Sequence, residues 1–123
     1  LIVFVKYYDE QFYQKSCEAI EAKISKRLLE SIFQKNSPLQ DGAVIISGNR
    51  IKSASCILPL TDKVDLPAQF GLRHRAGIGV TESNDATAII ISEETAEISY
   101  AKHGGVKINI SFTELEKVLN KDF

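Results

Sequence analysis

Residues 43–58 constrain the fold of this chain more than any other segment. Two runs rich in β-branched residues, 43–46 and 50–58, flank the dipeptide Gly48-Asn49. Because glycine and asparagine readily adopt the positive φ angles of two-residue hairpin turns, this pattern predicts an antiparallel β-hairpin. Pro59 ends the second strand, since proline cannot donate a hydrogen bond to the ladder. Any fold for this chain must therefore include a sheet that holds this hairpin.

Other segments extend the sheet. Residues 1–6 form a short apolar run rich in β-branched side chains, which is typical of a buried strand. A second hairpin is predicted over residues 86–103, with residues 93–96 at its turn, and Gly104-Gly105 forms a further turn. Residues 7–21 follow no clear pattern, so they receive no assignment.

Two helices carry recognisable start signals. Ser25 can cap a helix whose apolar side chains, at positions 28, 29, 32 and 33, recur at helical spacing, and this helix should stop near Asn36. Ser111 and Glu114 form a capping box at the start of a last helix. Strands mixed with helices and joined by hairpins indicate the α/β class, with a single mixed central β-sheet and helices packed around it.

The segment before and after Gly71 is harder to assign. Residues 61–71 are expected to form a loop and a short helix that stops at Gly71. In residues 72–83, Gly77 and Gly79 each disfavour a helix by about 1 kcal/mol. No clean alternation favours a strand there either, so local propensity leaves this segment open.

The composition is that of one ordinary globular domain. The 123 residues are 44% hydrophobic and 25% charged, and no apolar run is long enough to span a membrane. Cys17 and Cys56 are too few and too far apart to indicate a disulfide framework, so both are expected to be reduced and mostly buried. The chain begins without Met, inside an apolar run, and we therefore expect an N-terminally truncated fragment.

Three polar clusters lie at the ends of apolar runs, where loops place functional groups on a rigid scaffold. They are Asp41-Gly42-Ala43, Arg73-His74-Arg75 and Ser92-Glu93-Glu94. Together they supply carboxylates, guanidiniums, an imidazole and a hydroxyl, which are the groups that bind a metal ion and a polyphosphate. A guanidinium can hold phosphate oxygens bidentately, and a glycine beside a carboxylate lets a ligand approach the backbone.

Each cluster also has a purely structural interpretation, which the residues alone leave open. The first could be a turn that enters a strand, and the third an acidic turn. The arginines could be a solvated face whose charges pair with Glu82 or Asp85. No Walker loop or GxSxG nucleophile elbow occurs, and His103 lies in a polar turn. A net charge of -1 argues against a broad nucleic-acid-binding face.

Taken in order, the clusters resemble a known family. The segments SPLQDGAVIISGNRI, CILPL and GLRHRAGIGVTESNDATAIIISEETAEIS are similar to the catalytic domain of diadenylate cyclases, and the similarity extends over residues 1–101. These enzymes join two ATP molecules into cyclic di-AMP and release two pyrophosphates. The resemblance implies that residues 1–123 are a diadenylate cyclase catalytic domain with that family's fold, and hence a nucleotidyltransferase.

The resemblance also implies roles for individual residues. The metal, Mn2+, Mg2+ or Co2+, would be held by Asp41 and His74, and Asp41 would also activate the 3'-hydroxyl. The catalytic set would be Asp41, Gly42, Ala43, Arg73, His74 and Arg75. The nucleotide-binding set would be Ile57, Leu58, Pro59, Gly71, Leu72, Ser92, Glu93 and Glu94, of which residues 57–59 and Leu72 would line the adenine pocket. Gln40 and Leu72 stand where many members have His and Thr.

The product has two identical halves, whereas this domain offers one nucleotide site. A homodimer with two-fold symmetry is therefore expected to be needed for catalysis. No nucleic acid is expected as a partner, and membrane contact would come only through an upstream segment that tethers a cytoplasmic domain. An alternative hypothesis is a sensor that binds ATP or a cyclic dinucleotide without turnover, which the residues at Gln40 and Leu72 permit.

Overall fold

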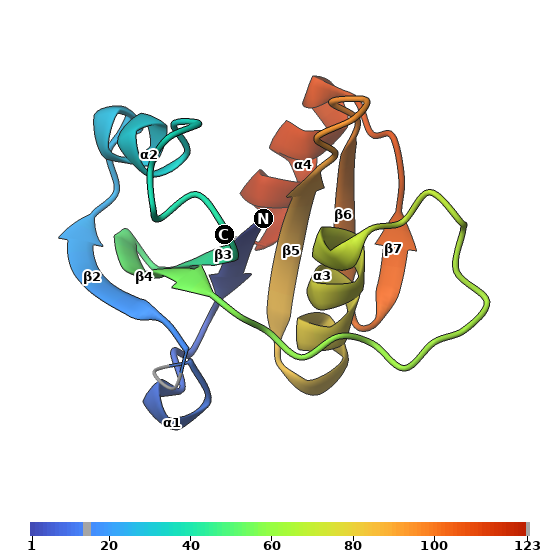
Figure 1. The fold of residues 1–123 in the computed structure, drawn as a ribbon, viewed down its shortest axis with the longest axis horizontal. Coiled ribbons are helices and arrows are strands. Elements are labelled where there is room, and N and C mark those ends of the chain that lie inside the picture. Colours follow the sequence, from blue (N-terminus) through green and yellow to red (C-terminus); the bar gives the residue numbers. More distant parts are fainter. Residues whose placement is uncertain (14–15, 123) are drawn as a thin grey trace.

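The computed structural model of the chain describes residues 1–13 and 16–122. Within them, seven strands form one mixed sheet in the order β2-β4-β3-β1-β5-β6-β7 (Figure 1). The strands are β1 (Ile2–Val5), β2 (Glu18–Lys23), β3 (Ala43–Ser47), β4 (Arg50–Cys56), β5 (Ala86–Ile91), β6 (Ile98–Lys102) and β7 (Gly105–Lys107). The helices are α1 (Glu10–Tyr13), α2 (Lys26–Ile32), α3 (Leu72–Ser83) and α4 (Phe112–Asp122).

The centre of the sheet is β1, which pairs in parallel with β3 and antiparallel with β5. Val3 lies between Ile45 of β3 and Ala88 of β5 in this register. Both expected hairpins, β3 with β4 and β5 with β6, are present. The predicted fold class, a single mixed sheet with helices around it, is confirmed.

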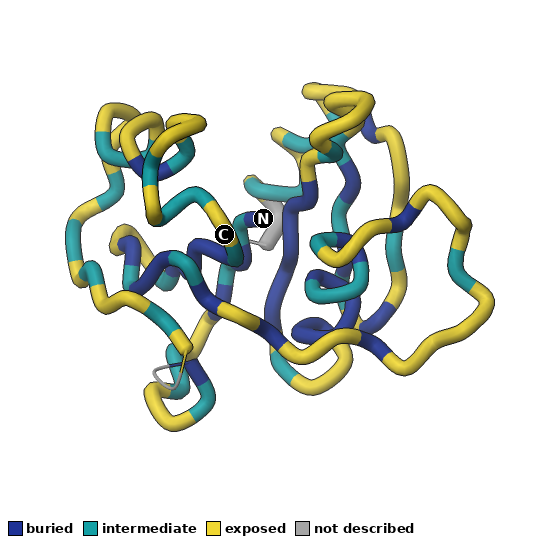
Figure 2. Tube along the Cα trace, in the orientation of Figure 1, coloured by how far each residue is buried: buried dark blue, intermediate teal, exposed yellow. Residues whose placement is uncertain are grey.

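The two faces of the sheet carry separate apolar cores, because successive side chains of a strand point to opposite faces. Val3, Ile45 and Ile90 belong to the core that α3 covers through Ile78 and Val80. Val44, Ile46 and Ile51 belong to the core on the opposite face, where α2 contributes Ile32. The central strands are accordingly the most buried part of the fold (Figure 2).

Close packing explains the two glycines of α3. A Cβ atom on Gly79 would lie 2.4 Å from the carbonyl oxygen of Pro59, and one on Gly77 would lie 2.9 Å from Cδ1 of Ile90. The segment that local propensity left open is therefore a helix, because the backbone contact with residues 59–61 and the packing on β5 favour it. In Figure 1, α3 lies in front of β5 and β6, and the loop from β4 runs around it.

Local signals placed the helix starts correctly but not every helix end. The Ser25 hydroxyl accepts a hydrogen bond from the Leu28 amide at 3.0 Å, and the Ser111 hydroxyl accepts one from the Glu114 amide at 3.1 Å. However, α2 ends at Ile32, before the expected end near Asn36. The short helix expected before Gly71 is wrong, since that segment makes only a turn in which the Phe70 amide donates to the Pro67 carbonyl.

The expectation of two reduced cysteines is also wrong. Cys17 and Cys56 form a disulfide across a sequence separation of 39 residues. The reason lies in β2, which the sequence did not reveal: Glu18 of β2 pairs with Ala54 of β4, and this register brings Cys17 beside the end of β4.

Every helix within residues 1–13 and 16–122 is too short or too polar to span a membrane.

Candidate active site

The three polar clusters meet at one edge of the sheet. Because β5 runs antiparallel to β1 while β3 runs parallel to it, the residues that precede β3 and those that follow β5 lie at the same edge. The first turn of α3 reaches this edge as well. A cavity of about 310 Å³ there is lined by Asp41, Gln69, Gly71, Leu72, Arg73, His74, Ile91, Ser92, Glu93 and Glu94.

The turn before β3 requires its glycine. Gly42 has a φ angle of +81°, a value that favours glycine. A Cβ atom there would lie 2.7 Å from the carbonyl oxygen of Cys56, and the Gly42 amide donates to Oδ1 of Asp41 at 3.0 Å. Asp41-Gly42 is thus a strand-entry turn, and it also presents the Asp41 side chain to the cavity. Ala43 is fully buried as the first residue of β3.

Arg73 and Glu93 join α3 to the turn after β5. Nη2 of Arg73 lies 2.5 Å from Oε1 of Glu93, and the two side chains are 27% and 73% exposed. Neither Glu82 nor Asp85 is the partner of Arg73, so that structural interpretation named the wrong acids. A cation and two neighbouring carboxylates, Glu93 and Glu94, therefore share the cavity wall.

His74 is held against an aromatic side chain. Its ring stacks on Phe70 with centroids 4.5 Å apart and an interplanar angle of 9°, and the residue is 9% exposed. Burial lowers the pKa of His74 from its usual value, and the nearby Glu97 carboxylate opposes this shift only in part. The imidazole is consequently neutral near pH 7, and it can donate one hydrogen bond or offer one nitrogen lone pair.

Arg75 points away from the cavity. Its Nη1 atom donates to the Lys63 carbonyl at 3.3 Å, and its own carbonyl accepts from the Thr61 amide at 3.1 Å. Both contacts hold the loop between β4 and α3. The basic motif is therefore divided, with Arg73 and His74 at the cavity and Arg75 behind it.

Apolar side chains flank the polar groups. Leu72 is 71% exposed and Ile91 is 48% exposed, and both line the cavity. Ile57 is also exposed, whereas Leu58 is buried in the core under α3, and residues 57–59 do not line this cavity. Gln40 lines an adjoining cavity of about 770 Å³ whose wall includes Arg73, Ser92 and Glu93.

No preformed metal cage exists in the part of the chain that the structure describes, since no three His, Cys, Asp or Glu side chains converge. The cavity nevertheless carries the carboxylates of Asp41, Glu93 and Glu94 and the neutral imidazole of His74. Oxygen donors of this kind suit Mg2+ or Mn2+, which commonly take one or two carboxylates and complete their shell with substrate phosphates. The donor set thus fits a cation that arrives with its substrate.

Two lining residues were missed at the level of sequence. Ile91 is the last residue of the apolar run before Ser92, so its position at the strand end was a usable signal. Gln69 lies in the loop before α3, where no pattern indicates which side chain turns inward. His103, expected in a polar turn, is exposed with a φ angle of 53°.

Comparison with protein families gives one clear match. Residues 1–106 match the family described as "DisA bacterial checkpoint controller nucleotide-binding". A diadenylate cyclase of Listeria monocytogenes EGD-e is 48% identical over 103 residues, which are 84% of this chain and 38% of that protein. The cyclic di-AMP synthase CdaA of Bacillus subtilis 168 is 41% identical over 104 residues, 85% of this chain and 38% of that protein. The chain thus spans about two fifths of the length of these relatives.

Solved structures agree with the fold. A crystal structure of a DacA double mutant from Staphylococcus aureus has a TM-score of 0.92 and 40% identity, and the match covers 98% of this chain and 81% of that chain. A hypothetical membrane spanning protein from Bacillus cereus has a TM-score of 0.78 and 36% identity, covering 89% and 54%.

Proposed function

We propose, from the premise that this chain belongs to the diadenylate cyclase domain family, that it joins two ATP molecules into cyclic di-AMP and releases two pyrophosphates. The observation that carries this proposal is the meeting of all three polar clusters at a single cavity. Phosphoryl transfer needs positioning and charge stabilisation more than covalent help from the protein. A carboxylate, a guanidinium, an imidazole and a hydroxyl at one wall supply those needs.

We propose a separate role for each of the polar and apolar residues at the cavity. We assign to Asp41 the acceptance of the proton from the attacking 3'-hydroxyl, and to Arg73 and His74 the stabilisation of developing phosphate charge. All three residues line the cavity. Ser92 offers a hydroxyl to the same phosphates. The exposed side chains of Leu72 and Ile91 offer an apolar surface for the base. Arg75 acts as a positioning residue, because its contacts go to the loop behind the cavity.

A divalent cation fits this site, and it would be held by Asp41, with His74, Glu93 or Glu94 beside it and substrate phosphates completing the shell. When bound, such a cation polarises phosphate oxygens and eases loss of the hydroxyl proton. The Arg73 guanidinium pairs with the Glu93 carboxylate. On this assignment Arg73 would bind a phosphate oxygen and Glu93 would offer an oxygen ligand, so substrate binding would separate the pair.

The two-fold symmetry of the product implies that two copies of this domain act together. Cyclic di-AMP has two identical halves, and one cavity with one set of clusters can hold one ATP. Two domains that face each other across a two-fold axis would let each 3'-hydroxyl attack the α-phosphate held by the partner. We also propose that residues 1–123 are the catalytic domain of a longer protein. That protein would keep the domain on the cytoplasmic side of a membrane; the similar Bacillus cereus protein is described as membrane spanning.

The test is product formation at several protein concentrations. The domain is incubated with ATP and Mg2+ or Mn2+, and nucleotides are separated by chromatography. Cyclic di-AMP should form, and its rate should rise more steeply than protein concentration if the dimer is weak. ATP binding without product at any concentration would contradict the proposal and favour a nucleotide sensor. A strictly linear rate down to nanomolar protein would contradict the need for a weakly associating dimer.

A further inference from the structure

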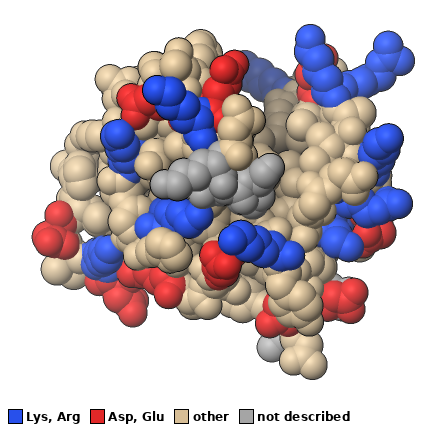
Figure 3. All heavy atoms as spheres, turned by 180° about the vertical axis from the view of Figure 1, so that it is seen from behind, with Lys and Arg blue, Asp and Glu red and all other residues tan. Residues whose placement is uncertain are grey.

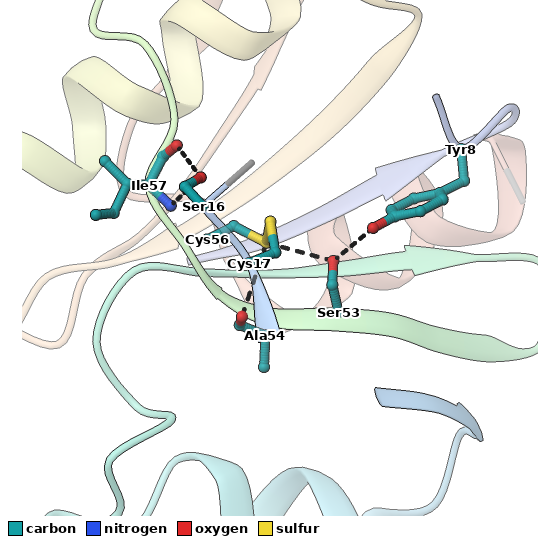
Figure 4. Close-up of a disulfide and its surroundings, with 7 residues drawn as sticks. All are labelled: Tyr8, Ser16, Cys17, Ser53, Ala54, Cys56 and Ile57. Carbon is teal, nitrogen blue, oxygen red and sulfur yellow. Dashed lines mark hydrogen bonds between the residues drawn. A yellow bond between two sulfur atoms is a disulfide. The ribbon is translucent and has the colours of Figure 1, made fainter. Parts of the chain in front are cut away.

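The disulfide between Cys17 and Cys56 stands at the end of β4, where the chain leaves the sheet (Figure 4). Cys56 is 1% exposed, whereas Cys17 is only partly buried. The neighbouring Ser16 adds two contacts, because its hydroxyl donates to the Ile57 carbonyl at 2.9 Å and accepts from the Ile57 amide at 3.2 Å. Residues 16–17 therefore clamp residues 56–57 through one covalent bond and two hydrogen bonds.

The clamped segment touches the turn that presents Asp41. Ser55 has a φ angle of 55°, and its carbonyl carbon lies 2.9 Å from the position that a Cβ atom of Gly42 would take. The carbonyl oxygen of Cys56 lies 2.7 Å from the same position. The backbone of residues 55–56 thus packs directly on Gly42, and a shift of this backbone must move the Asp41 turn or open a gap beside it.

The same segment then reaches the helix that carries the basic motif. The carbonyl oxygen of Pro59 packs on Gly79 of α3, and the Thr61 amide donates to the Arg75 carbonyl at 3.1 Å. Only a few residues separate the disulfide from these contacts. The end of β4 therefore links two of the three clusters, and the disulfide fixes where that link begins.

We propose that Cys17 and Cys56 form a reversible thiol–disulfide modification site whose oxidised state holds residues 55–61 in the arrangement that the nucleotide cavity requires. In forming the S–S bond, the two thiols pass two protons and two electrons to a low-molecular-weight disulfide, which leaves as two thiols. A thiol reductant reverses this by attacking Sγ of Cys17, the more accessible sulfur. The effect on catalysis rests on the proposed cyclase function.

Reduction should loosen the segment without unfolding the domain. The two hydrogen bonds of Ser16 remain possible, but they no longer have a covalent bond beside them. Apparent affinity for ATP should fall by at least about fivefold, the lower end of ordinary coupling between two sites. Amide exchange of residues 55–61 should become faster, while exchange in β6 and β7, on the far side of the sheet, should stay the same.

The experiment compares the full chain after oxidation with glutathione disulfide and after reduction with dithiothreitol. Intact mass establishes the two states, and hydrogen exchange, ATP binding and cyclic di-AMP synthesis are measured on each. The variant Cys17→Ser should match the reduced protein under both treatments. Equal exchange over residues 55–61 and equal ATP affinity in the two states would overturn the proposal. Exchange and affinity that respond while neither state makes cyclic di-AMP would instead refute the cyclase function and leave the modification site standing.

Discussion

The guanidinium of Arg73 and the carboxylate of Glu93 meet at 2.5 Å across the gap between α3 and the turn after β5. Both side chains are partly exposed, so this pair contributes at most about 1 kcal/mol to folding. Under the proposed function, the pair holds the Arg73 guanidinium at the cavity wall, where it would bind a substrate phosphate. The face seen from behind in Figure 3 shows acidic and basic side chains interspersed, in contrast to the basic motif at the start of α3.

Replacing Arg73 should therefore separate activity from stability. Arg73→Gln should lower kcat/KM for cyclic di-AMP synthesis by at least about 100-fold, the usual cost of losing one group that stabilises transition-state charge. The free energy of unfolding in urea should change by less than about 1 kcal/mol. Rates and unfolding curves on the same preparation check both statements, and a large loss of stability with full activity would reverse the assignment.

Asp41 should be needed for chemistry more than for binding. Asp41→Asn keeps the size of the side chain and an oxygen that can accept from the Gly42 amide, so the turn should survive. Product should fall below detection, while affinity for ATP falls much less, because the phosphate-binding groups remain. Binding by calorimetry and product by chromatography provide the two readouts. An unchanged rate would remove Asp41 from the mechanism.

Alanine substitutions at Gly79 and Gly71 should differ in their cost to stability, because only Gly79 packs closely against another segment. Gly79→Ala should destabilise the domain by about 1–3 kcal/mol, because its Cβ would meet the Pro59 backbone, which cannot move without displacing the loop. Gly71→Ala should cost about 0.5 kcal/mol or less, since nothing lies within 4 Å of that position. Thermal or urea unfolding of both variants measures the difference. Equal effects would show that the contact between α3 and the loop is not tight.

His74 should make the free energy of unfolding decrease as the pH falls below about 6.5. Its folded pKa lies below the usual 6.5, so the neutral form is favoured in the folded state. As pH falls through about 6.5 the unfolded chain takes up the proton first, and the free energy of unfolding decreases until the folded pKa is reached. His74→Phe keeps an aromatic ring on Phe70 but has no group that titrates there. Its free energy of unfolding should therefore decrease less on acidification than that of the unchanged protein. Urea unfolding between about pH 5 and pH 8 compares the two proteins.

Local chemistry explains which elements were predictable. The turn at Gly48-Asn49 and the caps at Ser25 and Ser111 depend on residues near in sequence, so the hairpin and both helix starts could be inferred. β2 could not, because it is an edge strand with mostly exposed side chains and a residue of positive φ, Glu21, so no alternation marks it. The disulfide was missed for the same reason, since only the pairing of β2 with β4 brings its cysteines together.

The candidate site was predictable as a set of motifs but not as a geometry. Each cluster could be found in the sequence, and the antiparallel course of β5 then explains why Asp41 and Ser92 share an edge. Nothing local indicates that Arg75 turns to the Lys63 carbonyl while Arg73 turns to Glu93. Local propensity alone left α3 open, because β5 and the loop at Pro59 both contact it and its apolar residues form no single stripe. Only the neighbouring clusters favoured a helix there, with glycines that allow close packing.

The most direct test of the proposed function follows the atoms of two substrates into one product. The domain is given equal amounts of ordinary ATP and ATP labelled with heavy nitrogen in the base, and the nucleotide product is weighed by mass spectrometry. We expect cyclic di-AMP in which about half of the molecules carry one heavy and one ordinary base, as random pairing across a symmetric dimer requires. ATP that is bound but recovered unchanged, or converted only to products with a single base, would contradict it.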